Sequence, residues 1–306
     1  MILAVCPNPS VDTYLYMDSF KMNESSRLTN KERYAGGKGI HVALAAAEMG
    51  EDVKLLAFWG GETGKWLKTQ CEKQGIECIG PELLEDNRTC FTIKTKDQND
   101  DTEILEAGPI ISGEDFNKFI IEYKNNLKDA NVISMSGSWP QNIPDNAYAE
   151  LVKIAKQNSK PHILDASGIQ MQLALKEKPY GIHINKTESE ELFNTSNPQE
   201  VFEKVSNEIK IIALTAGKDG LFLRMNKKNI HTKVELTDIY SAVGSGDCLT
   251  AGISIAVKNK AESIKTAQIA TAYGAANCLR QDLGMLYKKD VEKLMKEIKV
   301  LEITNE

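Results

Sequence analysis

The 306-residue sequence lacks any apolar run near the ~20 residues that a membrane-spanning helix requires. Its first residues, Met1–Val5, are apolar but have no basic segment before them, so they do not resemble a secretory signal. The six cysteines form no Cys-x-x-Cys pair and no zinc-type spacing, and we expect them to be free thiols in a reducing compartment. These features predict a cytoplasmic protein that does not act at a membrane.

An excess of positive charge is also lacking. There are 37 Lys and Arg residues against 43 Asp and Glu, which gives a formal net charge of −6. No overall positive field would therefore recruit nucleic acid. If the ligands are anions, the positive charge must be local, supplied by a few Lys and Arg side chains and by backbone N–H groups.

The chain has no internal repeat, low-complexity tract or long linker, and residues 1–306 are expected to form one domain. Short apolar, β-branched runs alternate with amphipathic helical patterns. The expected strands are 53–58, 132–135, 162–165, 181–184 and 211–214, and the expected helices are 40–50, 114–128, 145–157, 189–193 and 198–209. This alternation predicts an α/β fold with a Rossmann-like, mostly parallel sheet and helices on both faces.

Two segments, at about 12–34 and 88–106, interrupt this alternation because they lack helical periodicity. Residues 89–95 and 102–105 alternate in the manner of strands, and the polar run 97–101 between them is typical of a turn. We expect antiparallel strands inserted into the α/β body. Such a small sheet is either a lid over a site or a decoration at the edge of the main sheet, and the pattern favours neither.

A glycine-rich segment, Ser241–Asp247, leads into the apolar helical run Cys248–Val257. Gly244, Ser245 and Gly246 would turn the backbone so that its N–H groups, with the helix N-terminus, bind a multiply charged anion. Asp247 in the first helical turn can cap the helix. Beside bound phosphates it can instead accept a proton from an attacking hydroxyl group, which is the base that phosphoryl transfer needs.

A second glycine cluster, Ala35–Gly39, also opens a helix and places Lys38 where a ligand can approach the backbone closely. Two look-alikes are excluded. Gly60–Trp66 resembles a P-loop, but Trp59 stands where its first glycine is required and Trp66 replaces the Ser or Thr. Leu249 occupies the third glycine position of a dinucleotide fingerprint that would begin at Gly244.

Five segments together resemble the pfkB (ribokinase-like) family of carbohydrate kinases, in that family's order. They are Asn8–Asp12, Gly36–Gly39, Asn185–Glu188, Leu214–Leu221 and Val243–Gly252. Each is a weak signal alone, but the agreement of five in order, over nearly the whole chain, makes chance improbable. The resemblance implies a ribokinase-like core with a small β-sheet lid over the acceptor sugar.

Arg27, Arg88 and Glu106–Pro109 are similar to the branch of 1-phosphofructokinases and tagatose-6-phosphate kinases. This implies ATP-dependent phosphorylation of fructose 1-phosphate, tagatose 6-phosphate or fructose 6-phosphate. Arg27, Lys38 and Arg88 would match the phosphate charge of such an acceptor. If both arginines are only solvated lid charges, the acceptor is instead an unphosphorylated sugar or a nucleoside. A non-catalytic sugar-phosphate sensor is disfavoured, because it gains nothing from a positioned base.

The resemblance also implies roles for individual residues. Asp247 would be the base beside the Gly244–Gly246 anion hole, and Glu188 would act on Mg²⁺ through water. The acceptor site would comprise Asp12, Arg27, Gly37, Lys38, His41, Arg88 and Ser138. ATP would lie across Asn185, Lys186, Thr215, Ala216, Gly217, Lys218, Gly220 and Asn277. The lid sheet would also form a homodimer.

His41 departs from the resemblance, because the family usually has Asn at this position. A neutral imidazole offers one donor and one acceptor, and it becomes charged near pH 6.5. If His41 replaces a sugar-binding Asn, its ring faces the acceptor pocket near Asp12 and Lys38. The alternative is an ordinary residue on the helix surface.

Overall fold

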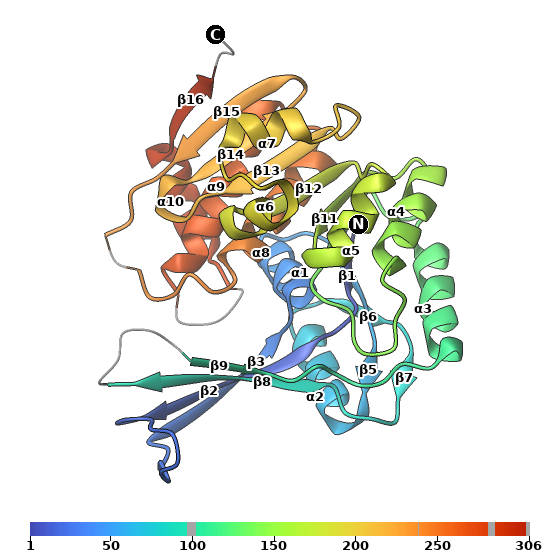
Figure 1. Ribbon diagram of the computed structural model, residues 1–306, viewed down its shortest axis with the longest axis vertical. Helices are drawn as coiled ribbons and strands as arrows, with labels where there is room; N and C mark the ends of the chain where they lie inside the picture. The colour runs from blue at the N-terminus through green and yellow to red at the C-terminus, as the bar shows by residue number, and fades with distance from the viewer. Residues whose placement is uncertain (97–101, 238, 281–284, 304–306) are drawn as a thin grey trace.

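The computed structural model describes residues 1–96, 102–237, 239–280 and 285–303. At its centre is a ten-stranded sheet (Figure 1). The order across the described strands is β16-β15-β14-β13-β12-β11-β10-β1-β4-β6. Their bounds are β1 Ile2–Cys6, β4 Val53–Ala57, β6 Glu77–Ile79, β10 Val132–Ser136, β11 His162–Asp165, β12 Gly181–Asn185, β13 Ile211–Thr215, β14 Leu221–Met225, β15 Lys228–Lys233 and β16 Lys299–Ile303.

Neighbouring strands from β13 to β6 run parallel, and β14, β15 and β16 continue the sheet with antiparallel pairs. Helices cover both faces. They are α1 Lys38–Glu48, α2 Gly61–Glu72, α8 Ser245–Lys258, α9 Ser263–Cys278 and α10 Lys288–Glu297 on one face, and α3 Gly113–Asn126, α4 Ala147–Gln157, α5 Gly168–Lys176, α6 Lys186–Phe193 and α7 Pro198–Lys204 on the other. The predicted α/β class, with its mostly parallel sheet, is confirmed.

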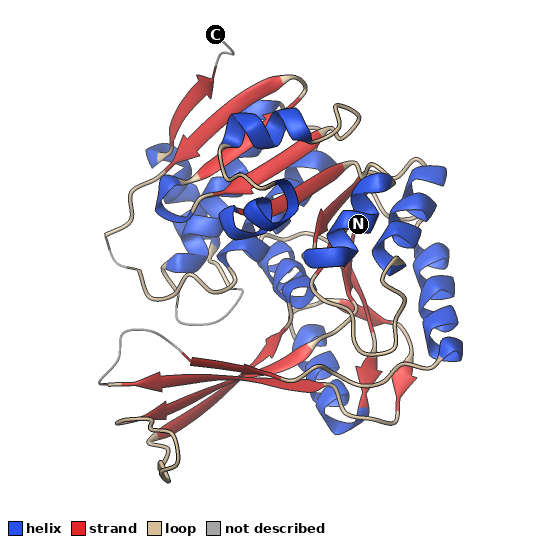
Figure 2. Cartoon of the chain, in the orientation of Figure 1, coloured by secondary structure: helices blue, strands red, loops and turns tan. Residues whose placement is uncertain are grey.

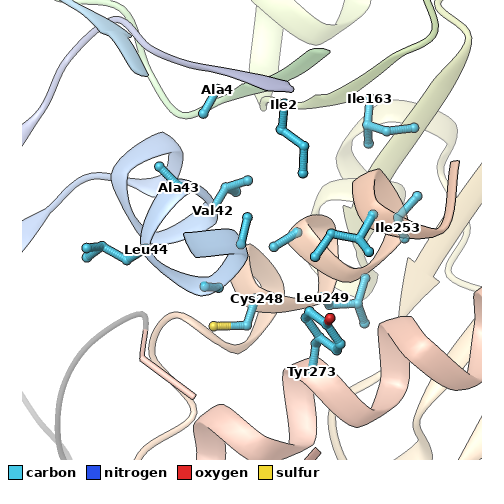
Figure 3. Close-up of a cluster of buried hydrophobic side chains, with 14 of the residues drawn as sticks. Ile2, Ala4, Val42, Ala43, Leu44, Ile163, Cys248, Leu249, Ile253 and Tyr273 are labelled. Atoms are coloured by element: carbon cyan, nitrogen blue, oxygen red, sulfur yellow. The ribbon is translucent and has the colours of Figure 1, made fainter. Parts of the chain in front are cut away.

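Strand β1, third from the β6 edge of the sheet, is buried on both faces, and its side chains alternate between two cores. Ile2 and Ala4 belong to the core under α1, α8 and α9, whereas Leu3 and Val5 belong to the core under α3 and α4. A continuous apolar run is what a strand covered on both sides requires. Figure 3 shows Ile2 beside side chains from α1 and α8, so the two helices pack together against this strand.

Four strands form a separate small sheet in the order β3-β2-β8-β9, which extends from one side of the body (Figure 2). They are β2 Ser10–Met17, β3 Asn30–Gly36, β8 Arg88–Thr95 and β9 Thr102–Leu105. The two interrupted segments therefore do form an inserted sheet. A further short pair, β5 Trp59–Gly60 and β7 Glu82–Leu83, lies beside α2.

The expectation of antiparallel strands holds within each hairpin but is wrong between the hairpins. β2 pairs with β3, and β8 with β9, in antiparallel fashion, but β2 and β8 run parallel. Both leave the main body in the same direction, because each is the outgoing strand of its own hairpin (Figure 1). The polar run 97–101, expected as a turn, lies outside the described residues.

The helix expected at 198–209 ends early, because α7 stops at Lys204 and Val205 is extended. Val205 and Ile209 are nonetheless buried in the core. The guanidinium of Arg224 on β14 donates hydrogen bonds to the carbonyl oxygens of Phe202, Val205 and Ser206. This distant side chain satisfies carbonyl groups at the helix end, which local periodicity does not reveal.

Candidate active site

A cleft of about 1240 Å³ opens at the carboxyl ends of β11, β12 and β13 and extends beneath the small sheet. Its lining includes Asp12 of β2, Arg88 of β8 and Leu105 of β9, together with the first turn of α8. Ligand sites in open parallel sheets form at this edge, where strand ends leave a crevice. The small sheet therefore covers a site, and the alternative of mere edge decoration does not describe it.

The glycine-rich segment forms the N-terminus of α8. Gly244 is the N-cap residue, with a φ of 85°, and no side chain caps the helix. Ser245, Gly246 and Asp247 occupy the first turn and line the cleft. The first N–H groups of a helix have no intrahelical acceptor, so this turn presents donors and a positive dipole end to the cleft.

A side chain at Gly246 would crowd His183 of β12. A Cβ atom at position 246 would lie 3.0 Å from Cε1 of His183, which is buried. Nε2 of His183 in turn lies 3.2 Å from Oγ1 of Thr215 at the end of β13. The Gly244–Gly246 loop therefore packs against the ends of β12 and β13.

Asp247 does not act as a helix cap, because its carboxylate is held by His41 of α1. Nδ1 of His41 lies 2.7 Å from Oδ2 of Asp247, and Nε2 lies 3.7 Å from Oδ2 of Asp12. Burial alone would lower the pKa of His41, but the hydrogen bond that Asp247 accepts and the charges of Asp247 and Asp12 outweigh it, and the pKa is raised. The ring faces the cleft next to Asp12, so it is not an ordinary helix-surface residue.

Asp12 lies where β2 meets the end of β3. Oδ1 of Asp12 accepts a 2.6 Å hydrogen bond from Ser10, and the carboxylate occupies the space that a side chain at Gly36 would fill. A Cβ atom there would lie 2.1 Å from Cγ of Asp12. Burial raises the pKa of Asp12, against the opposing effects of His41, Ser10 and Arg88.

A second charged group centres on Asp165, at the carboxyl end of β11. The carboxylate is buried and accepts hydrogen bonds from Lys38 at 2.8 Å and Thr250 at 3.3 Å, while Nδ1 of His183 lies 2.7 Å away. Burial alone would raise the pKa of Asp165, but Lys38 and His183 outweigh it and hold the pKa below its usual range. Asp165 in turn raises the pKa of Lys38, which burial opposes.

The Asn185–Glu188 motif forms a capping box at the start of α6. Oδ1 of Asn185 accepts from the N–H of Glu188, and Oε2 of Glu188 accepts from the N–H of Asn185, both at 2.9 Å. The remaining oxygen, Oε1 of Glu188, lies 3.7 Å from Nζ of Lys38. Asn185 lines the cleft, whereas Glu188 reaches it through Lys38.

The predicted nucleotide edge is a strand–turn–strand unit, as expected. β13 ends at Thr215, a short 3₁₀ turn spans Gly217–Asp219, and β14 begins at Leu221. Lys186 pairs with Asp219 at 2.9 Å across the outer rim. The predicted residues that line the cleft here are Lys186, Thr215, Ala216, Gly217, Lys218 and Gly220.

Four predicted site residues do not line the cleft, and Glu188, which reaches it only through Lys38, is one of them. Arg27 is exposed in the connection between β2 and β3. Ser138 is exposed beside Asn8, whose Nδ2 lies 3.5 Å from Oγ of Ser138. Asn277 is buried in α9, where its Nδ2 donates to the carbonyl of Met285 at 2.8 Å. All other predicted acceptor, loop and nucleotide residues line it.

Sequence analysis missed Asp165 and His183, which lie beneath Lys38 and Gly246. Both sit inside apolar strand runs without a recognisable motif. The one signal available was the position of Asp165 as a carboxylate at the end of a strand in a parallel sheet. The segment Lys233–Thr237, which also lines the cleft, carried no signal.

No helix in the described part of the chain is both long and apolar enough to cross a membrane. Within the same residues, no group of three or more His, Cys, Asp and Glu side chains could hold a metal ion.

The family model for pfkB carbohydrate kinases matches residues 8–287. The chain belongs to this family. It is an ATP-dependent carbohydrate kinase, as the sequence predicted. Tagatose-6-phosphate kinase from Staphylococcus epidermidis is 31% identical over 312 residues, which cover 99% of this chain and all of that protein.

Solved structures share the fold at lower identity. Phosphofructokinase-2 from Escherichia coli superposes with a TM-score of 0.88 at 20% identity, covering 96% of this chain and 98% of that chain. Arabidopsis thaliana ribokinase, solved with ribose and ATP, superposes with a TM-score of 0.78 at 19% identity, with the same coverage of both chains. These likenesses confirm the ribokinase-like fold.

The buried Asp165 gives a test that does not depend on activity. Asp165→Asn removes the partner of Lys38 and should lower the free energy of unfolding by about 3 kcal/mol, the lower end of the range for a broken buried pair, because the Lys38 side chain is 40% exposed. Urea denaturation measures the loss. Glu191→Gln, an exposed carboxylate on α6, is the control.

The pH dependence has a definite sign. Because the folded-state pKa of Asp165 lies below its ordinary value of 3.8, its contribution is complete above that value and is lost only as pH falls through the folded pKa. The difference from wild type should therefore be the same at about pH 7 and about pH 5. A difference that closes by about pH 5 would contradict the depressed pKa.

Proposed function

We propose that the protein transfers the γ-phosphoryl group of ATP to a hydroxyl group of a ketohexose phosphate. The observation that carries the proposal is the position of Asp247 in the first turn of α8, beside the Gly244–Gly246 loop and in the same cleft as Asp12 and Arg88. The base, the N–H groups that would bind phosphate and the groups that would bind the acceptor thus lie in one cleft, and phosphoryl transfer requires little else.

In the proposed reaction, a carboxylate oxygen of Asp247 accepts the proton of the attacking hydroxyl group. The hydroxyl oxygen forms a bond to the γ-phosphorus while the bond from that phosphorus to the leaving ADP oxygen breaks. N–H groups of Gly246 and Asp247 and the dipole of α8 stabilise the negative charge on the transferring group. Mg²⁺, when bound, neutralises charge on the phosphates.

We place the nucleotide along the rim formed by Asn185, Lys186, the Thr215–Gly220 turn and the α8 N-terminus. Lys38 lies between this rim and Asp12, with its ammonium group anchored by Asp165. It is well placed to contact the transferring phosphoryl group as a point charge. Glu188 would hold a water of the Mg²⁺ shell, oriented by its own contact with Lys38.

The acceptor would lie between Asp12, His41 and Arg88, with Asp12 accepting hydrogen bonds from sugar hydroxyl groups. We propose fructose 1-phosphate, tagatose 6-phosphate or fructose 6-phosphate as the acceptor. The similarity to a protein named tagatose-6-phosphate kinase supports a phosphorylated ketohexose. Measuring ATP consumption with these three sugars, and with unphosphorylated sugars and nucleosides, separates the candidates.

Asp247→Ala should lower kcat about 100-fold or more, because the reaction loses its general base. Binding of ATP, measured by titration calorimetry, should be retained, since the N–H groups of the loop are unchanged. Asp145→Ala, which removes an exposed carboxylate before α4, is the control and should keep wild-type turnover. Near-wild-type turnover in Asp247→Ala would remove this residue from the mechanism.

Arg88 supplies the test of a phosphorylated acceptor. Its Nη1 donates to the carbonyl of Glu106 at 3.3 Å, and its buried Nε has no hydrogen-bond partner among the described residues. Arg88→Ala should raise KM for the sugar phosphate at least about 10-fold, the value of one hydrogen bond to a charged group. KM for ATP should change little.

The control for Arg88→Ala is Arg33→Ala in the same small sheet. Arg33 lies over the ring of Trp66, with its guanidinium carbon 4.8 Å from the ring centre, and does not line the cleft. An unchanged KM for the sugar phosphate in Arg88→Ala would favour an unphosphorylated sugar or a nucleoside as acceptor.

We further propose a homodimer formed through the small sheet. Ile104 of β9 and Met22 in the β2–β3 connection are 51% and 78% exposed, and an apolar sheet surface of this kind requires a cover. Light scattering at micromolar concentration should give about twice the chain mass of 33.9 kDa. Ile104→Glu should give monomers, whereas Ile121→Glu on α3, where the side chain is 54% exposed, should not. A monomeric wild type would refute the proposal.

A further inference from the structure

His41 lies between two carboxylates that come from different parts of the chain. Its side chain is 5% exposed. Nδ1 lies 2.7 Å from Oδ2 of Asp247 on α8, and Nε2 lies 3.7 Å from Oδ2 of Asp12 on β2. Nε2 is buried and makes no hydrogen bond within the described residues. The imidazole therefore joins the proposed acceptor-binding carboxylate to the proposed base.

The geometry indicates which protonation state the ring adopts. A distance of 2.7 Å is typical of a hydrogen bond between charged groups. If only Nδ1 carried a proton, the lone pair of Nε2 would face the carboxylate of Asp12 in a buried space, which is unfavourable. With both nitrogens protonated, each N–H faces a carboxylate. The imidazolium form thus fits both sides, in accord with the raised pKa of His41.

The other groups around the ring do not reverse this conclusion. Cys6 at the end of β1 is fully buried, and burial raises the pKa of its thiol to about 11, so it stays neutral. The cation on the same helix, Lys38, is paired with Asp165 of β11. Arg88 of β8 acts on the far carboxylate, where it lowers the pKa of Asp12.

We infer that His41 is a positioning residue whose imidazolium is the counter-ion that keeps Asp12 and Asp247 ionised together. By holding Oδ2 of Asp247, it also leaves Oδ1 for the substrate hydroxyl group. An asparagine at this position would keep a hydrogen bond but supply no charge. The inference rests on the proposed function for the roles of the two carboxylates, but the ion pairing itself can be measured without catalysis.

The inference fixes the direction of a change in the pH profile. A neighbouring cation lowers the pKa of a carboxylate, and two like charges in one buried site raise one of their pKa values. His41 is charged throughout the acid range in which carboxylates titrate, because its pKa lies above 6.5. Without it, the pKa of Asp12, which burial already raises, rises further, and protonated Asp12 is a poorer acceptor for sugar hydroxyl groups.

The kinetic experiment compares kcat/KM for the sugar phosphate with pH in wild type and His41→Asn. The acid limb of the profile should move to higher pH by about one unit in the variant. A limb that stays in place, or moves to lower pH, overturns the inference. His41→Gln serves as a second uncharged variant. The control is His162→Asn, which removes a buried histidine bonded to the carbonyl of Lys160, outside the cleft, and should leave the limb unchanged.

The second experiment follows the ring nitrogens of His41 by NMR in the enzyme without ligands. The signals should report an imidazolium that titrates above the ordinary value of 6.5, and Asp12→Asn should lower that pKa because one of the two carboxylates becomes neutral. A pKa at or below 6.5, or one that Asp12→Asn does not lower, overturns the inference. If no sugar phosphate is phosphorylated by the wild type, the proposed function fails, while this titration still decides the ion pairing.

Discussion

The packing of α1 and α8 against β1 is the constraint on which the cleft depends. Val42 of α1 and Ile253 of α8 meet in the same buried cluster as Ile2 (Figure 3). This contact sets the distance between the two helix N-termini, and with it the distance between His41 and Asp247. Because apolar burial holds the two helices in place, the polar residues at their N-termini can keep charged groups close together without being part of the core.

Each buried carboxylate in the cleft faces a basic side chain. Asp165 faces Lys38, and Asp247 and Asp12 share His41. Burying a charge without a partner is costly, so a site that needs several carboxylates must supply cations at matching positions. The net charge of −6 hides this local balance. The first turn of α8 adds uncapped N–H groups to the same cleft.

Periodicity and motifs predicted the α/β fold, the inserted sheet and the two glycine-rich helix starts, because these are local properties of the sequence. The parallel pairing of β2 with β8 depends on a distant segment, and so does the end of α7, where Arg224 bonds the carbonyl groups. Local patterns do not record either contact. Asp165 and His183 were missed for the same reason, since only the assembled sheet brings them together. Arg27, Ser138 and Asn277 were assigned by resemblance, with a charge argument added for Arg27, and they lie outside the cleft.

Because β2 and β8 run parallel, the small sheet is attached to the body at one end, beside the cleft, and its other end points away. Ser10 pairs with Arg88 at the root, and Met17 pairs with Thr95 seven residues further out, about 23 Å away. A rotation about the root moves the far end most and the near end least. In any such rotation, Asp12 and Arg88, which lie near the root, would move least relative to α8. Movement of the outer end would thus leave the residues that β2 and β8 contribute to the cleft nearly in place.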